Sequence, residues 1–205
     1  MIELTRCHNV SADLILASAS QARTRLLAEA GVNHHCDPAH IDETGIKKTW
    51  SGPAKGLAEK LAREKAQVVS ARHPGALVIG SDQVLAFGDK IFDKPESVQC
   101  ARQSLKQLRG HEHKLISALN VVCDGQELWT HTDSAVLIMR SFSDAFLEDY
   151  LNRVGEDVIH SVGAYHLEGR GAQLFETVTG DFFTVLGLPL IPLLSFLRTQ
   201  NFLKS

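Results

Sequence analysis

The chain has 205 residues, 44% hydrophobic and 22% charged, which is enough sequence and apolar content for a globular protein with a sizeable core. Its formal charge of −3 argues against general affinity for nucleic acid or acidic membranes, so any anion site must be local. The four cysteines form no C-x-x-C pair, and no apolar run is long enough to span a membrane. We expect residues 1–12 to be a loose lead-in without a hydrophobic signal core, and the protein to be cytoplasmic.

Residues 14–31 are predicted to form a buried strand followed by an amphipathic helix. Ser20 suits the N-cap of this helix and Gly31 its end. A strand that enters a helix through a small, hydroxyl-bearing turn directs backbone N–H groups and the helix dipole at one point, and Arg23 adds positive charge there. These features are typical of a phosphate-binding turn. Taken alone, they also fit an ordinary strand–turn–helix with solvated arginines.

The rest of the first half is predicted to contain both strands and helices. We expect a strand at 32–43, a long helix at 51–71, a buried strand at 76–79, a hairpin at 84–92 and a helix at 97–109. The first of these strands should break at Pro38 and resume toward Asp42 and Glu43. The second should end at Ile79 and lead into Gly80, Ser81 and Asp82.

The second half is predicted to begin with a strand meander. We expect strands at 114–123, 126–132 and 135–139, followed by a helix at 143–154 and a glycine-rich loop at 163–171. Two further strands are expected at 174–178 and 182–186, and a final helix at 187–197. Alternating strands and helices followed by a meander indicate an α/β fold with a mixed sheet. Without a repeat or a linker, residues 1–205 are expected to form a single domain.

Four charged residues have the composition of a metal–triphosphate site. Asp82 is expected at a strand end, where α/β proteins place ligands, although it could simply cap a turn. Glu43 follows another predicted strand, and Lys65 and Lys94 supply positive charge. Carboxylates suit a hard cation, and lysines suit phosphate oxygens. The ten histidines show no complete metal-binding spacing, and the sequence contains no P-loop, G-x-G-x-x-G or G-x-S-x-G motif.

Seven short motifs, in this order, resemble the Maf family of nucleoside triphosphate pyrophosphatases across residues 14–197. They are LILASASQARTRLLAEAGV, IDE, LAREKA, GSDQV, DKP, GAYHLEG and GDFFTVLGLPL. The resemblance implies a two-lobed α/β fold of the Maf/ITPase-like kind, in which helices flank a mixed sheet and a cleft separates the lobes. It also implies a homodimer in many members.

The resemblance further implies hydrolysis of a nucleoside triphosphate to the monophosphate and pyrophosphate with a divalent cation, Mg²⁺ or Mn²⁺. It assigns catalytic positions to Asp82, Glu43, Lys65 and Lys94, and a phosphate-binding turn to Ser18, Ser20 and Arg23. We expect Asp82 and Glu43 to hold the metal and Asp82 to act on the attacking water. The chain departs from the family pattern S-P-x-R-R, because Gln21 replaces the proline and Thr24 the second arginine.

Base preference is predicted from Ala22, Gln83 and Glu168. Gln83 with Glu168 is similar to the family branch that acts on 7-methyl-GTP, and a carboxylate can accept both N1–H and N2–H of guanine. Ala22 departs from the large aromatic common in that branch. Removal of modified nucleotides, with 7-methyl-GTP as a candidate, is therefore the expected function. A dTTP/UTP pyrophosphatase, or a nucleotide-binding regulator of cell division with little hydrolysis, is the alternative.

Overall fold

The computed structural model describes residues 13–204, so the predicted lead-in at 1–12 lies outside the described residues. Within these described residues, seven strands form one sheet in the order β2-β1-β3-β5-β6-β7, and β4 pairs with β3. The strands are β1 (Leu14–Leu16), β2 (His35–Cys36), β3 (Leu77–Phe87), β4 (Lys90–Phe92), β5 (Glu112–Cys123), β6 (Gln126–Met139) and β7 (Phe175–Thr179). Pairing of β1 with β2 and β3 is parallel and all other pairing is antiparallel, so the predicted mixed sheet is confirmed.

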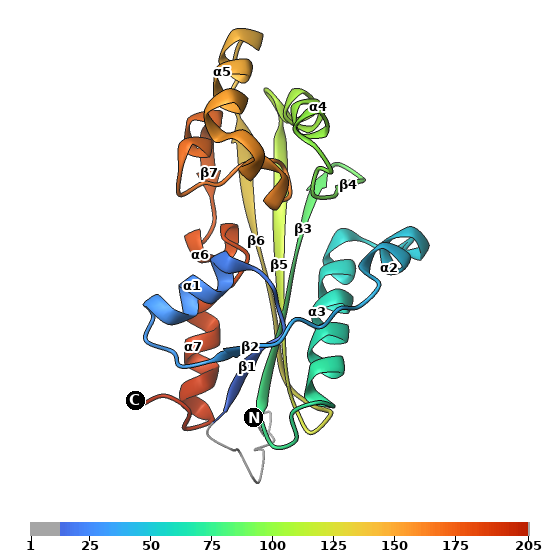
Figure 1. The fold of residues 1–205 in the computed structure, drawn as a ribbon, viewed down its shortest axis with the longest axis vertical. Helices are drawn as coiled ribbons and strands as arrows, with labels where there is room; N and C mark the ends of the chain where they lie inside the picture. Colours follow the sequence, from blue (N-terminus) through green and yellow to red (C-terminus); the bar gives the residue numbers. More distant parts are fainter. Residues whose placement is uncertain (1–12, 205) are drawn as a thin grey trace.

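Helices flank this sheet. They are α1 (Gln21–Glu29), α2 (Glu43–Thr49), α3 (Ala54–Ser70), α4 (Val98–Leu108), α5 (Asp144–Val154), α6 (Phe182–Val185) and α7 (Leu190–Thr199), with 3₁₀ helices η1 (Gly155–His160) and η2 (Arg170–Leu174). The long strands β3, β5 and β6 run along the length of the molecule, with α4 and α5 toward one end and α1, α3 and α7 toward the other (Figure 1).

Alternation along β1 explains why helices cover both faces of the sheet. Leu14 and Leu16 pack in one apolar cluster with residues of α1 and α7, whereas Ile15 packs in another with Val69 of α3. Successive side chains of a strand point to opposite faces, so an uninterrupted apolar run predicts burial on both sides. A third cluster fills the end of the molecule that carries α4 and α5, around Leu105.

Four predictions about helices and strands are wrong in kind or extent. The strand expected to resume toward Glu43 is instead helix α2, because Asp42 accepts a hydrogen bond from the backbone N–H of Gly45 and caps the helix. The strand expected at 182–186 is helix α6, capped in the same way by Asp181. The strand expected at 76–79 and the first strand of the hairpin expected at 84–92 are one continuous strand, β3, so Asp82 lies within a strand and not at its end. In the same way, the strands expected at 126–132 and 135–139 are one continuous strand, β6.

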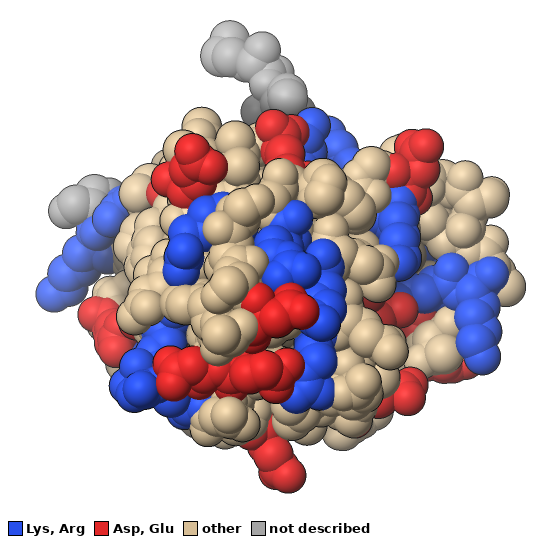
Figure 2. Space-filling model, turned by 90° about the horizontal axis from the view of Figure 1, so that it is seen from above, with Lys and Arg blue, Asp and Glu red and all other residues tan. Residues whose placement is uncertain are grey.

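No helix within residues 13–204 has both the length and the apolar character needed to cross a membrane. The face of the molecule seen from above in Figure 2 carries basic and acidic side chains close together and not in separate regions. This agrees with the low net charge, and it means that an anion-binding site on this face must be built from a few particular side chains.

Candidate active site

A cleft opens where one edge of β3 has no neighbouring strand. β1 pairs with β3 only as far as Ile79 and β4 begins to pair at Leu85, so within the described residues positions 80–84 have no strand on this edge. The cleft holds about 980 Å³, and segments from across the chain line it. Its lining includes every site residue predicted from the sequence: Ser18, Ser20, Ala22, Arg23, Glu43, Lys65, Asp82, Gln83, Lys94 and Glu168.

Close packing of α3 on β3 brings Lys65 to Asp82. A Cβ on Gly80 would lie 2.0 Å from the backbone oxygen of Ala62, so only glycine allows α3 to approach the strand this closely. Gly80 and Asp82 lie on the same face of β3, and Lys65 lies on the buried face of α3. The Nζ of Lys65 is therefore 2.6 Å from Oδ1 of Asp82, and both side chains are largely buried.

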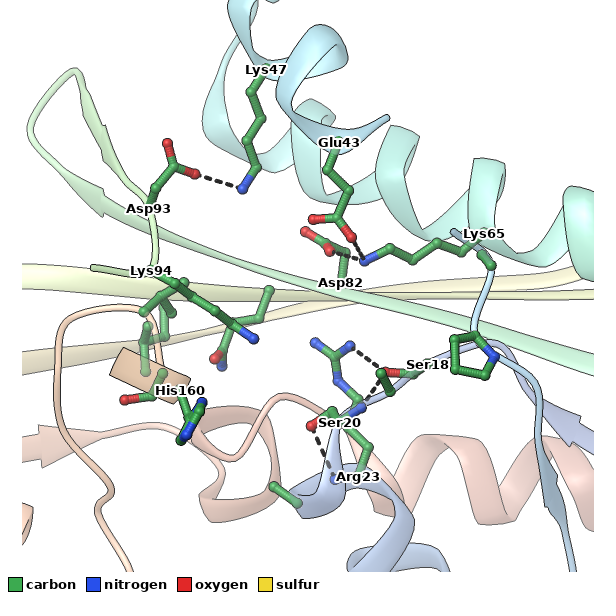
Figure 3. A pocket seen from close by; sticks show the side chains of 18 of the residues that line it. Ser18, Ser20, Arg23, Glu43, Lys47, Lys65, Asp82, Asp93, Lys94 and His160 are labelled. Atoms are coloured by element: carbon green, nitrogen blue, oxygen red, sulfur yellow. Dashed lines mark hydrogen bonds and ion pairs between the residues drawn. The ribbon is translucent and has the colours of Figure 1, made fainter. Parts of the chain in front are cut away.

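Lys65 also pairs with Glu43. Its Nζ lies 2.7 Å from Oε1 of Glu43, the first residue of α2, so one lysine joins two carboxylates (Figure 3). Partial burial acts to raise the pKa of Glu43, but the charge and hydrogen bond of Lys65 outweigh it and lower the pKa below its ordinary value. Glu43 is therefore held as a carboxylate.

Arg23 lies across the cleft from this cluster, and it is buried and tightly held. Its Nε donates to the carbonyl oxygen of Gly187 at 2.8 Å, and its Nη1 donates to the carbonyl of Ser81 at 2.8 Å and to Oγ of Ser18 at 3.2 Å. Its Nη2 has no partner among residues 13–204. Burial lowers the pKa of Arg23, partly offset by Asp82, and the remaining donors of this fixed guanidinium are available to an anion.

The turn before α1 has the geometry predicted for phosphate binding. Ser20 caps α1 by accepting from the backbone N–H of Arg23, and its own N–H donates to Oγ of Ser18 at 3.2 Å. Both hydroxyl oxygens act as acceptors in these bonds, which leaves their protons to donate to another group. Lys94 points into the same cleft (Figure 3), and partial burial, together with repulsion from Arg23, lowers its pKa.

The three residues predicted to select the base also line the cleft. The amide nitrogen of Gln83 donates to the carbonyl oxygens of Thr184 and Val185, both at 3.0 Å, so this side chain is fixed against α6. Glu168 pairs through Oε1 with Nη2 of Arg25 at 3.0 Å. Ala22 contributes only a methyl group to the lining.

Two carboxylate oxygens remain available for a cation. Lys65 contacts Oδ1 of Asp82 and Oε1 of Glu43, and Oδ2 and Oε2 have no partner within residues 13–204. The described residues include no group of three or more metal-ligating side chains. Two carboxylates suit Mg²⁺ or Mn²⁺ when substrate phosphates supply further ligands, so the donor set fits a metal that arrives with a nucleotide.

Lys47 and Asp93 are cleft residues that the sequence reasoning missed. The Nζ of Lys47 lies 2.6 Å from Oδ1 of Asp93, and both residues line the cleft (Figure 3). Lys47 is four residues after Glu43 in α2, so the two share a helix face. The sequence signal that could have found Lys47 is Asp42, because an N-cap at this position predicts a helix that begins at Glu43.

Comparison with known proteins gives the family of this chain. The family model described as "Maf-like protein" matches residues 13–200. The chain belongs to the Maf family. A nucleoside triphosphate pyrophosphatase of Paramagnetospirillum magneticum is 51% identical to this Maf-family protein over 190 residues, which cover 91% of this chain and 98% of the relative. The 7-methyl-GTP pyrophosphatase of Rhizobium etli is 47% identical over 189 residues, which cover 90% of this chain and 94% of that relative.

Among solved structures, a HAM1 protein from Coxiella burnetii aligns with a TM-score of 0.40 and 12% identity, over 62% of this chain and 72% of that chain. The cytoplasmic location and the homodimer stay predictions, as does the division of this Maf-family protein into two lobes of one domain.

Proposed function

We propose that this Maf-family protein hydrolyses nucleoside triphosphates to the nucleoside monophosphate and pyrophosphate. The observation that carries the proposal is the arrangement of the cleft, where Lys65 joins Asp82 and Glu43 opposite the buried Arg23. Carboxylates on one side suit activation of water, and fixed cations on the other suit the charge of a triphosphate tail. The names of the two relatives support the same reaction.

In the proposed mechanism, each group acts through an atom that the protein leaves available. The free oxygen of Asp82 accepts a proton from water as the water oxygen bonds to the α-phosphorus. The bond from that phosphorus to the bridging oxygen breaks, and pyrophosphate leaves. Arg23 and Lys94 offset the charge that develops on the leaving group, and the hydroxyls of Ser18 and Ser20 donate to phosphate oxygens. Lys65 keeps both carboxylates in place.

We further propose that Asp82 and Glu43 hold Mg²⁺ or Mn²⁺, with Oε2 of Glu43 as the main ligand, so that Oδ2 of Asp82 stays free for the proton of the water. When bound, this ion would neutralise phosphate charge and polarise the reacting phosphoryl group. The two carboxylates alone make a sparse ligand set, so we expect the ion to bind tightly only with a nucleotide. Titrating the ion with and without a non-hydrolysable nucleotide tests this, and equal affinity in both titrations would contradict it.

The test of the reaction is pyrophosphate release from a panel of canonical and modified nucleoside triphosphates, with Mg²⁺, with Mn²⁺ and with EDTA. We expect Asp82→Asn to lower kcat about 100-fold or more, because the amide cannot accept the proton. Asp89→Asn, in the exposed turn between β3 and β4, removes the same charge outside the cleft and should leave turnover unchanged. Near-normal turnover in Asp82→Asn would remove Asp82 from the catalytic role.

For the base, we propose a preference for 7-methyl-GTP that depends on Glu168. Its Oε2 has no partner among residues 13–204 and can accept from the edge of guanine, whereas uracil presents acceptors on both sides of its single donor. Glu168→Gln should lower kcat/KM for 7-methyl-GTP about tenfold and affect UTP less. Glu176→Gln on β7 is the matched control. Equal wild-type activity on both nucleotides would contradict the preference and favour the dTTP/UTP alternative.

A nucleotide-binding regulator with little hydrolysis is the second candidate. The altered turn, in which Thr24 stands where the family has a second arginine, is the observation that favours it. Tight nucleotide binding without pyrophosphate release from any member of the panel would support the regulator over the enzyme.

A further inference from the structure

We propose that Lys47 is a further phosphate-binding residue, which contacts the triphosphate tail in place of the arginine that position 24 lacks. This inference rests on the proposed function, because it concerns the same cleft and the same substrate. It adds a residue from α2 that none of the sequence motifs includes.

The need for another cation follows from how the other basic side chains are used. The single charge of Lys65 is shared between Asp82 and Glu43, so little of it remains for a phosphate. Arg25 does not line the cleft. Only Arg23 and Lys94 are then left, among the predicted site residues, to offset the several negative charges of a triphosphate tail.

Thr24 itself contributes no group to the cleft. The hydroxyl of Thr24 donates to the carbonyl of Ser20 at 3.1 Å and lies 3.2 Å from Sγ of Cys36. Thr24 is also absent from the cleft lining, although it lies one residue after Arg23. The chain therefore supplies no second cation from α1 at the phosphate-binding turn.

Lys47 has the position and the freedom to supply that charge. It lines the cleft on the same helix face as Glu43, and its ammonium group lies on the side of the cleft where Asp93 precedes Lys94 (Figure 3). Its partner Asp93 has 62% of its side chain exposed, and ion pairs this exposed to water contribute little. A phosphate oxygen in the cleft can therefore replace Asp93 as the partner of Lys47.

Titration calorimetry with inorganic triphosphate, with and without Mg²⁺, tests the inference independently of catalysis. We expect Lys47→Met to raise the Kd for triphosphate about tenfold, and Lys47→Arg to restore most of the affinity. In steady-state assays with nucleotides, Lys47→Met should raise KM by a similar factor and change kcat less. Lys55→Met, on α3 and outside the cleft, controls for loss of one positive charge and should bind like the wild type.

Asp93→Asn separates phosphate binding from a purely structural bridge. It breaks the same ion pair but keeps the charge of Lys47, so affinity for triphosphate should equal or exceed that of the wild type. A loss in Asp93→Asn as large as in Lys47→Met would overturn the inference, because the bridge would then be what matters. Lys48, the next residue of α2, also lines the cleft. Unchanged affinity in Lys47→Met, a loss confined to Lys48→Met, or a wild type that does not bind triphosphate would overturn the inference too. Triphosphate binding by a wild type that releases no pyrophosphate would instead contradict the proposed function alone.

Discussion

Lys65 shows how one side chain can set the properties of two others. It is 11% exposed, lies between the carboxylates of Asp82 and Glu43, and offers a positive charge where two negative charges would otherwise repel each other. A buried carboxylate without a partner is costly, so this lysine has a role in stability as well as in the proposed chemistry. Its charge is also a principal reason why the pKa of Glu43 lies below its ordinary value.

At this scale we predict that Lys65→Met lowers kcat about 100-fold or more and shifts the acid limb of the pH–rate profile upward. The shift follows because the pKa of Glu43 rises once Lys65 no longer favours the ionised form, so the carboxylate is lost at higher pH. Lys60→Met, an exposed lysine of the same helix that pairs with Glu64, is the control. A pH profile of Lys65→Met that overlays the wild type would contradict the assigned role.

At the scale of elements, the start of α2 decides where Glu43 and Lys47 lie. The backbone N–H of Gly45 donates to Oδ1 of Asp42 at 2.9 Å, and this cap turns the chain into a helix at Glu43. Residues 38–41 show no helical pattern, so the local sequence predicts that the strand continues toward Glu43. A strand at this position does not predict that Lys47 lies on the same face as Glu43, because that relation depends on helical spacing.

We therefore predict that Asp42→Ala impairs activity through Glu43 as well as lowering stability. Loss of an N-cap costs about 1 kcal/mol. Ser143→Ala removes a comparable cap from α5, where Oγ accepts from the N–H of Phe146 at 3.1 Å, and is the matched control. Both variants should have a lower free energy of unfolding in urea, but only Asp42→Ala should lose pyrophosphate release. If Asp42→Ala and Ser143→Ala release pyrophosphate equally fast, the cap of α2 does not position Glu43 for the reaction.

At the scale of the whole molecule, the two ends of the long sheet have separate apolar clusters, and polar groups buried in them affect stability. His113 of β5 is 1% exposed in the cluster around α4 and α5. Its Nε2 lies 2.7 Å from the hydroxyl of Tyr165, and its Nδ1 has no partner among the described residues. Burial lowers the pKa of His113 to about 4, so the folded protein keeps it neutral.

The sign of the pH dependence follows from this difference. An unfolded histidine takes up a proton near its ordinary pKa of 6.5, whereas the folded one does so only near 4. The unfolded state therefore binds more protons between these values, and the free energy of unfolding should fall as pH falls from about 6.5 to about 4. His113→Gln should reduce this fall, and His35→Gln, at an exposed position on β2, should not. Parallel stability–pH curves for all three proteins would contradict the prediction.

Much of the fold followed from local sequence. The apolar runs of β1 and β3, the caps of α1 and α5, and the turns at the glycines predicted most elements, because their causes lie within a few residues. The short, contiguous motifs also named candidate site residues, and the structure places all of these in the lining of one cleft. The local sequence does not predict helices α2 and α6, because each depends on a single aspartate cap. It does not predict that β3 continues through Gly80, because a glycine there resembles a strand end.

What only the tertiary structure decided is how those residues meet. The amino-acid sequence by itself determined which side chains carry charge and which segments are apolar. It did not determine that β1 stops at Ile79 while β4 starts at Leu85, which leaves the edge of β3 open beside Asp82. Nor did it determine that Lys65 would serve two carboxylates while Arg25 is held by Glu168. Such pairings depend on distances between segments far apart in the chain, and these distances are set only when the sheet and its helices pack together.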